Sequence, residues 1–185
     1  MRRFEGQLAV ITASTAGIGL SIAERFASEG ALVVISSRKQ KNVDEALEKL
    51  KGTGKVKGIV CAVNNKEHRQ QLFHFATTVA FPELEFRKID VLVSNAACSP
   101  YFGETLQTPE RAFDKLFEVN VKATFFLIAE AQNFLTDGAS ILIISSYLAF
   151  NPSSPIGIYG VTKTALLGLT KVLANELGQR KIRVR

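Results

Sequence analysis

A tyrosine and a lysine four residues apart have the residue types and spacing for proton transfer. Tyr159 and Lys163 lie in a stretch with helical periodicity, where residues i and i+4 share one face. A phenol titrates near pH ~10 and is a poor acid or base at neutral pH. A nearby ammonium stabilises the phenolate, so Tyr159 could give a proton to a carbonyl oxygen or take one from an alcohol. For this spacing alone, a surface pair on a helix is the ordinary alternative.

A hydroxyl group is available to hold the substrate in such a site. Ser146 follows an apolar run at 141–144 that predicts a strand. In doubly wound folds, ligands bind at the carboxyl ends of the strands. Ser146 is therefore a candidate to hold a substrate carbonyl oxygen, and Lys163 is a candidate to bond the ribose of a nicotinamide cofactor as well.

Residues 12–19 (TASTAGIG) form a glycine-containing turn between an apolar run and a helical pattern. A turn at this point lets the backbone approach a pyrophosphate closely and aims the positive end of the helix at it. Gly17 and Gly19 suit that role, since a Cβ would obstruct the phosphate or the packing of helix on strand. This placement favours dinucleotide binding over an ordinary tight turn.

The end of the second expected strand carries positive charge. Dinucleotide-binding folds place an acidic residue here when they hold a ribose 2′-hydroxyl, and none is present. Arg38 and Lys39 instead offer charge for a 2′-phosphate, and Ser36 and Ser37 offer hydroxyls. We therefore expect NADP(H) rather than NAD(H). A solvated basic turn is the alternative, because Lys41 lies nearby.

Apolar runs of strand length alternate with helical patterns along the chain. The expected strands are 8–11, 32–35, 58–63, 89–93 and 141–144, with a sixth opening at 182–184. The first expected helix runs from 18 to a stop at Gly30, and the second begins at a cap at Asn42 with Glu45 completing a capping box. A third covers 67–79, and a fourth begins at 108–109 with Pro109 at the first helical position. The last runs from Tyr159 to near Gly178. Residues 81–88 are expected to form a loop.

Strands that are apolar along their whole length, each followed by a helix, indicate a parallel sheet that is covered on both faces. We therefore expect a doubly wound α/β fold (a Rossmann fold) with three α/β/α layers, in one domain that spans residues 1–185.

Composition excludes several other classes of protein. The 185 residues carry a net charge of +6, but the basic residues are scattered, so no nucleic-acid partner is expected. The chain contains no run of eighteen apolar residues, so no membrane-spanning helix is expected. Cys61 and Cys98 lie far apart, and His68 and His74 would point to different faces of a helix, so no metal site is expected.

Together these motifs resemble the short-chain dehydrogenase/reductase family. The matching elements are residues 12–19, the SNAA segment at 94–97, Asn120, Ser146 and the Tyr159/Lys163 pair. The chain is most similar to the peroxisomal branch of NADP-linked carbonyl and retinal reductases. That branch shares Ala13 and the segments SSRKQ at 36–40, NVD at 42–44 and KTALLGLTK at 163–171.

The resemblance implies a role for each site residue. Tyr159 would be the acid/base, Lys163 would tune it, and Ser146 would polarise the carbonyl. Asn120 would kink its helix and hold a water in a proton relay. The residues expected to bind NADP(H) are Thr12, Ala13, Ser14, Thr15, Gly17, Ile18, Gly19, Ser37, Arg38, Lys39, Val63, Asn95, Ala96, Tyr159 and Lys163.

The resemblance also implies a homodimer or homotetramer formed through the two long helices. Their apolar side chains suit helices that are buried on more than one side, although core packing explains them equally well. These side chains are Phe125, Phe126, Leu127, Ala165, Leu166, Leu169, Val172 and Leu173.

The chain departs from the family pattern at several positions. Ala97 replaces a usual glycine, and Ala62 stands where an aspartate often meets the adenine ring, which leaves one adenine contact in doubt. Tyr147 is bulkier than the residue in many members and is a candidate to shape the substrate pocket. The resemblance implies a further strand and substrate-loop helices beyond Arg185, so the domain is expected to be incomplete at its C-terminus.

The sequence thus predicts an NADP(H)-dependent reductase that converts a ketone, an aldehyde or a retinoid-like carbonyl to an alcohol. Retinoids, aromatic ketones, quinones and α-dicarbonyls all remain open as substrates. The alternative is a catalytically silent module that binds nucleotide or associates with longer relatives. The chain ends in Val184-Arg185 without a peroxisomal tripeptide, so a cytoplasmic location is expected, and a peroxisomal one only for a longer form.

Overall fold

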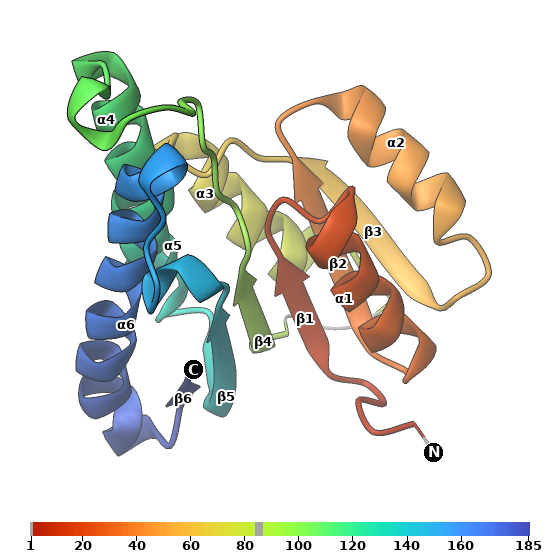
Figure 1. Ribbon diagram of the computed structural model, residues 1–185. Helices are drawn as coiled ribbons and strands as arrows, with labels where there is room; N and C mark the ends of the chain where they lie inside the picture. Colours follow the sequence, from red (N-terminus) through yellow and green to blue (C-terminus); the bar gives the residue numbers. More distant parts are fainter. Residues whose placement is uncertain (1, 84–86) are drawn as a thin grey trace.

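The computed structural model describes residues 2–83 and 87–185 and contains one parallel sheet (Figure 1). The order of the six strands in the sheet is β3-β2-β1-β4-β5-β6. Their bounds are β1 Leu8–Ile11, β2 Leu32–Ser37, β3 Lys55–Val60, β4 Ile89–Ser94, β5 Leu135–Ile143 and β6 Arg183–Val184. Val10 pairs with Val34 of β2 on one side and with Leu92 of β4 on the other, so β1 lies inside the sheet.

Helices cover both faces of the sheet because its strands are apolar on both sides. Successive side chains of β1 point to opposite faces. Leu8 and Val10 pack with α3, α5 and α6, whereas Ala9 and Ile11 pack with α1 and α2. The predicted doubly wound, three-layer fold is confirmed. The helices are α1 Gly17–Ser28, α2 Gln40–Lys49, α3 Lys66–His74, α4 Glu110–Phe117, α5 Ala123–Ala131 and α6 Gly157–Leu177.

Two predictions, one about β3 and one about α2, were wrong. Strand β3 covers Lys55–Val60 rather than 58–63, because its register follows β2 from Leu32 onward. Helix α2 begins at Gln40 with Lys39 as its N-cap, so Asn42 does not cap it. The chain leaves β2 directly into α2, and the Asn42 amide instead approaches the Ser37 hydroxyl at 3.5 Å.

The second half of the chain also differs from prediction in its boundaries. Strand β5 covers Leu135–Ile143 and contains Gly138 at φ +85°, so it is longer than the apolar run at 141–144. Pro109 is the N-cap of α4 rather than its first residue. Two helices continue into π-helical turns, at Phe75–Val79 and Glu118–Lys122. Helix α6 starts before Tyr159, and part of the expected 81–88 loop lies outside the described residues.

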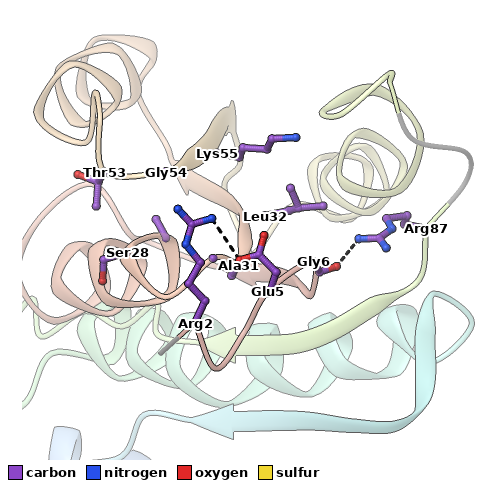
Figure 2. Close-up of a pocket in the computed structure, with 12 residues that line it drawn as sticks. Arg2, Glu5, Gly6, Ser28, Ala31, Leu32, Thr53, Gly54, Lys55 and Arg87 are labelled. Atoms are coloured by element: carbon purple, nitrogen blue, oxygen red, sulfur yellow. Dashed lines mark hydrogen bonds and ion pairs between the residues drawn. The ribbon is translucent and has the colours of Figure 1, made fainter.

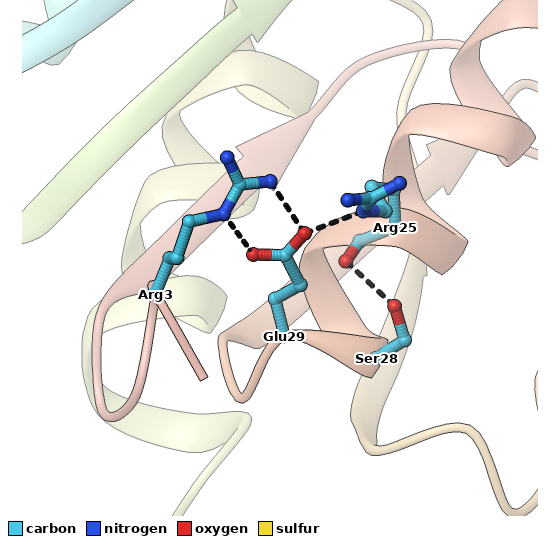
Figure 3. Close-up of polar contacts among 4 residues, drawn as sticks. All are labelled: Arg3, Arg25, Ser28 and Glu29. Carbon is cyan, nitrogen blue, oxygen red and sulfur yellow. Dashed lines mark hydrogen bonds and ion pairs between the residues drawn. The ribbon is translucent and has the colours of Figure 1, made fainter. Parts of the chain in front are cut away.

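A cluster of ion pairs holds the amino-terminal segment at the amino edge of the sheet. Arg3 and Arg25 both bond the carboxylate of Glu29, which follows the end of α1 (Figure 3). The side-chain hydrogen bonds from Arg3 and Arg25 lower the pKa of Glu29 from 4.5 to about 2. Because Glu29 precedes β2, this cluster ties the residues before β1 to the amino edge of the sheet.

A pocket lies at the same amino edge, where Arg2, Lys55 and Arg87 line it (Figure 2). Arg2 pairs with Glu5 at 3.3 Å, and Arg87 donates to the Gly6 carbonyl. These residues all precede or begin strands. Because ligands in such sheets bind beyond the carboxyl ends of the strands, this pocket lies at the edge opposite to the expected site.

Helix α6 packs one side against the core. In the described part of the chain, the segment Ser154–Arg180 is the one long and apolar enough to cross a membrane, with a mean hydropathy of 1.2. Leu166, Leu173 and Leu177 of α6 are buried in the core cluster with Leu92 and Ile141. The core helix of a folded domain has this composition too, so the finding is weak evidence for a membrane span.

Candidate active site

The direction of strand order reverses between β1 and β4, and six of the residues expected to bind the cofactor line a cleft beyond this point. The four predicted catalytic residues are not among the residues that line it. Strands β2 and β3 follow β1 on one side, while β4 to β6 lie on the other. At such a switch point the loops diverge and leave a crevice for a ligand. The cleft is lined by Ala13, Thr15, Ala16, Ser37, Arg38, Cys61, Val63, Asn64, Ala96, Ala97, Cys98, Lys115 and Val119.

The two predicted glycines of the turn after β1 have different structural roles. A Cβ on Gly19 would lie 2.6 Å from Asn95 Nδ2 and 2.7 Å from the Ala13 carbonyl oxygen, so only glycine fits there. Gly17 has φ +54°, and nothing lies within 4 Å of a Cβ built on it. Gly19 therefore permits close packing, whereas Gly17 supplies a left-handed backbone on an open side of the turn.

Thr12 and Ser14 use their hydroxyls to shape this turn. Both side chains are fully buried. Ser14 Oγ donates to the Ile11 carbonyl at 2.6 Å and accepts from the Ser36 N–H at 3.0 Å. Thr12 Oγ1 accepts from the Asn95 N–H at 3.0 Å. Their hydroxyls are engaged inside the protein, so any contact of these two residues with a cofactor falls to their backbones.

Asn95, which follows β4, joins that strand to the same turn. Its side-chain Nδ2 donates to the carbonyls of Thr12 at 3.1 Å and Ala13 at 3.0 Å. Ala13 has φ +50°, an uncommon conformation for a residue with a Cβ. The two hydrogen bonds from Asn95 help to hold this strained residue in place.

The end of β2 carries two cations without carboxylate partners. Arg38 and Lys39 are exposed and form no ion pair with any residue in 2–83 or 87–185. Ser37 is half-buried at the strand end. Ser36 is fully buried, so the expectation that its hydroxyl faces a ligand is wrong: β2 alternates its side chains, and Ser36 points into the protein.

Tyr159 and Lys163 lie in the first two turns of α6. Lys163 is buried, its Nζ lies 5.7 Å from the centre of the Tyr159 ring, and it donates to the Ile144 carbonyl at 2.7 Å. Burial lowers the pKa of Lys163 from 10.5 to about 8, opposed in part by the charge of Cys98. The predicted pair therefore exists as a phenol beside a desolvated amine.

Ser146 follows β5 and begins a short 3₁₀ turn over Tyr147–Ala149. Its Oγ accepts from the Leu148 N–H at 3.2 Å, which fixes the side chain at the carboxyl edge of the sheet. The adjacent Ser145 Oγ donates to the Lys163 carbonyl at 3.1 Å. The end of β5 and the start of α6 are thus joined directly next to the Tyr159/Lys163 pair.

Asn120 lies in the π-helical turn at Glu118–Lys122, which is the helix irregularity that the resemblance implies at this residue. Its side chain is fully buried. Oδ1 accepts from the Cys98 N–H at 2.8 Å, while Nδ2 donates to the Cys98 carbonyl at 3.0 Å and to Thr162 Oγ1 at 3.1 Å. Asn120 thus links the β4 loop to α6, and the relay water stays a prediction.

Three residues that support this site are not predicted by the sequence. Thr162 accepts a hydrogen bond from Asn120, and Ser145 donates one to the Lys163 carbonyl. The Cys98 backbone makes two hydrogen bonds with the Asn120 side chain. The sequence carries a signal for Thr162 only, as a residue inside the Tyr159/Lys163 motif. It carries no signal for Cys98 and Asn120, because their contact joins two different elements.

A family model described as enoyl-(acyl carrier protein) reductase matches residues 12–185, which include every site residue described above. The chain belongs to the short-chain dehydrogenase/reductase family. It is 54% identical over 177 residues to tropinone reductase-like 3 of Erythroxylum coca, and 48% identical over 183 residues to dehydrogenase/reductase SDR family member 4 of Bos taurus. A solved dehydrogenase/reductase from Sinorhizobium meliloti 1021 has a TM-score of 0.89 at 30% identity.

The chain covers only part of the length of these short-chain dehydrogenase/reductases. The plant match uses 95% of this chain and 66% of its relative, and the bovine match uses 97% and 63%. The bacterial structure is matched over 99% of this chain and 71% of its own. Within the described residues, no group of three or more His, Cys, Asp or Glu side chains could hold a metal ion.

Proposed function

We propose that the chain forms the nucleotide-binding and catalytic part of an NADP(H)-dependent oxidoreductase that reduces a carbonyl to an alcohol. One observation carries the proposal: the buried Lys163 lies one helical turn from Tyr159 and has no carboxylate partner among the described residues. A buried cation is costly to the fold unless it is paired. Its position beside a phenol gives it a catalytic reason to be there.

The cleft beyond β1 suits a dinucleotide phosphate. The open side of Gly17 and the start of α1 would hold the pyrophosphate on backbone N–H groups. The unpaired cations Arg38 and Lys39 would hold a 2′-phosphate, and their position supports NADP(H) over NAD(H). When bound, the cofactor would supply the hydride for the carbonyl carbon.

The chain's own residues then handle the proton and the orientation of the substrate. Tyr159 would donate its hydroxyl proton to the carbonyl oxygen. The Lys163 ammonium would stabilise the phenolate that remains. Ser146, at the end of β5, would donate a hydrogen bond to the same oxygen and fix its position.

Association through α5 and α6 belongs to this proposal. Leu127, Leu166 and Leu173 are buried in the core, whereas Phe125, Phe126 and Val172 stay exposed at 42%, 39% and 60%. Exposed aromatic and aliphatic side chains on neighbouring helices favour a protein–protein contact. A homo-oligomer, a small-molecule carbonyl substrate and a cytoplasmic location complete the proposal.

The test is NADPH oxidation by the purified chain with an α-dicarbonyl substrate, compared with Tyr159→Phe. Loss of the general acid should lower kcat by about 10²- to 10⁴-fold, while NADPH should still bind. Tyr101→Phe is the matched control, because the Tyr101 hydroxyl bonds only the nearby Glu104 carbonyl in the described structure. NADPH binding without turnover in the unmodified chain would favour the silent nucleotide-binding module. Absence of binding would refute the proposal.

A further inference from the structure

A second cation besides Arg38 lines the cleft, and it comes from the other side of the switch point. Arg38 follows β2, which lies on one side of β1. Lys115 belongs to α4, which follows β4 on the other side of β1 (Figure 1). Both residues line the same cleft. The cleft therefore has a basic residue on each side.

The Cys98 thiol, which also lines the cleft, lies within reach of both charges. Burial raises the pKa of this thiol, and the charges of Lys115 and Arg38 act in the opposite direction. Cys98 Sγ also lies 3.7 Å from the Lys115 carbonyl oxygen, so α4 packs against the loop that follows β4. An anion bound in this part of the cleft would thus be attracted by both cations.

Lys115 is held by a carboxylate that it can leave. Its Nζ lies 2.7 Å from Glu118 Oε2, and both side chains are 40% exposed. The other carboxylate oxygen, Oε1, accepts from Asn64 Nδ2 at 3.0 Å. The hydrogen bonds from Lys115 and Asn64 lower the pKa of Glu118, so this carboxylate is charged at neutral pH. An ion pair this exposed contributes little to stability, so its cation is available to a stronger anion.

The carboxylate of this pair stands beside the cleft. Asn64 and Lys115 line the cleft, whereas Glu118 lines two neighbouring pockets and is not among the residues described for the cleft itself. A phosphate monoester carries a charge of about −1.5 to −2 at pH 7 and attracts an ammonium more strongly than a single carboxylate does. Glu118 would compete with such a phosphate for the same ammonium and would repel it.

We propose that Lys115 is a specificity-determining residue for NADP(H), which leaves Glu118 and joins Arg38 on the 2′-phosphate when the cofactor binds. Glu118 then sets the strength of this contact, because its carboxylate competes for Lys115. The inference rests on the proposed function, since it requires the dinucleotide to bind in this cleft. It predicts effects of opposite sign for the two partners of one ion pair.

The test measures the Kd of NADPH and of NADH by calorimetry for a pair of variants. Lys115→Gln removes the cation and should weaken NADPH binding about three- to tenfold, with little change for NADH. Glu118→Gln removes the competing carboxylate and should strengthen NADPH binding about two- to fivefold. Both variants break the same ion pair, so a purely structural role of that pair would change the two Kd values in the same direction.

Two further variants serve as controls for charge and position. Lys115→Arg keeps a cation in the cleft and should retain the preference for NADPH. Lys122→Gln removes the exposed lysine at the end of the π-helical turn after α4, which lines the neighbouring pockets rather than the cleft, and should change neither Kd. Urea unfolding of all four variants shows whether each is folded.

The outcomes separate this inference from the proposed function. Unchanged NADPH binding in Lys115→Gln, together with loss of the NADPH preference in Arg38→Ser, would overturn the inference alone. Equal losses for NADPH and NADH in Lys115→Gln would also overturn it, because the cation would then act on the pyrophosphate or on the fold. Weaker NADPH binding in Glu118→Gln would overturn it too. If the unmodified chain binds neither dinucleotide, the proposed function fails and the inference fails with it.

Discussion

The two edges of the sheet differ in whether their basic side chains are paired with carboxylates. At the amino edge, Arg3 and Arg25 share the Glu29 carboxylate, and Lys55 lies 3.4 Å from Glu83. At the carboxyl edge, Arg38, Lys39 and Lys163 have no carboxylate partner in the described parts of the chain. Lys115, which also lines the cleft, is an exception because it pairs with Glu118 at 2.7 Å.

The difference separates cations that are paired within the fold from cations that have no carboxylate partner in the described residues. A paired cation gains most of its interactions within the protein. An unpaired cation on the surface keeps its charge for an external anion, and a buried one lowers stability and is retained for another reason.

Removal of an unpaired surface cation should give the largest effect on the preference between the two cofactors. Arg38→Ser is expected to lower kcat/KM for NADPH by about 10- to 100-fold, because it removes charge-assisted hydrogen bonds to the 2′-phosphate. The NADH value should change little, and so should the free energy of unfolding. Steady-state kinetics with both cofactors and urea unfolding measure these quantities.

Arg2→Ser at the amino edge is the matched control for Arg38→Ser. It breaks an exposed pair with Glu5 and should leave the ratio of the two cofactor efficiencies unchanged. If Arg2→Ser changes that ratio as much as Arg38→Ser does, the contrast between the edges is not functional.

Lys163→Met should be more stable than the unmodified chain but inactive. Burial lowers the Lys163 pKa to about 8, so a neutral side chain should raise the free energy of unfolding by roughly 1–3 kcal/mol at pH 7 and abolish turnover. Since the folded-state pKa lies below the unfolded value, the unmodified chain should gain stability as the pH rises from 8 to 10.5, and the difference between the two proteins should shrink. Urea unfolding at pH 7 and 10 tests this, and a more stable unmodified chain at pH 7 would contradict it.

Two alanine substitutions should separate packing from ligand binding within the β1 turn. Gly19→Ala places a Cβ against the Ala13 carbonyl and should lower the free energy of unfolding by about 1–3 kcal/mol. Gly17→Ala meets no atom but has to adopt φ +54°, at a cost of about 1–2 kcal/mol, and its Cβ should also weaken NADPH binding. Thermal unfolding and calorimetry measure both effects. If both variants lose NADPH affinity in the same proportion to their loss in free energy of unfolding, the two glycines do not differ in role.

The smallest effect is expected at Glu29, where the charges are paired. Its pKa is lowered to about 2 by hydrogen bonds from Arg3 and Arg25, so its contribution to stability is present above pH 4.5 and is lost as the pH falls toward 2. Glu29→Gln should therefore have a lower urea midpoint than the unmodified chain at pH 7, and the difference should vanish near pH 2. A difference that persists at low pH would mean that packing, rather than charge, is responsible.

Periodicity in the sequence identified the elements better than their ends. The buried strands β1 and β4 were predicted within one residue, because continuous apolar runs mark strands that are covered on both faces. Strands β3 and β5 were misplaced, because both have a polar or glycine-containing half that pairs by backbone hydrogen bonds alone. The side chains in those halves give no apolar signal.

The sequence by itself determined the order of elements, the phosphate turn, the cations at the end of β2 and the spacing of Tyr159 and Lys163, since each depends on residues close together in the chain. Only the tertiary structure decided that Lys163 is buried, that Asn120 joins Cys98 to Thr162, and that Ser145 joins the end of β5 to α6. Those properties depend on contacts between elements far apart in sequence, where desolvation and hydrogen-bond geometry arise only after the helices pack on the sheet.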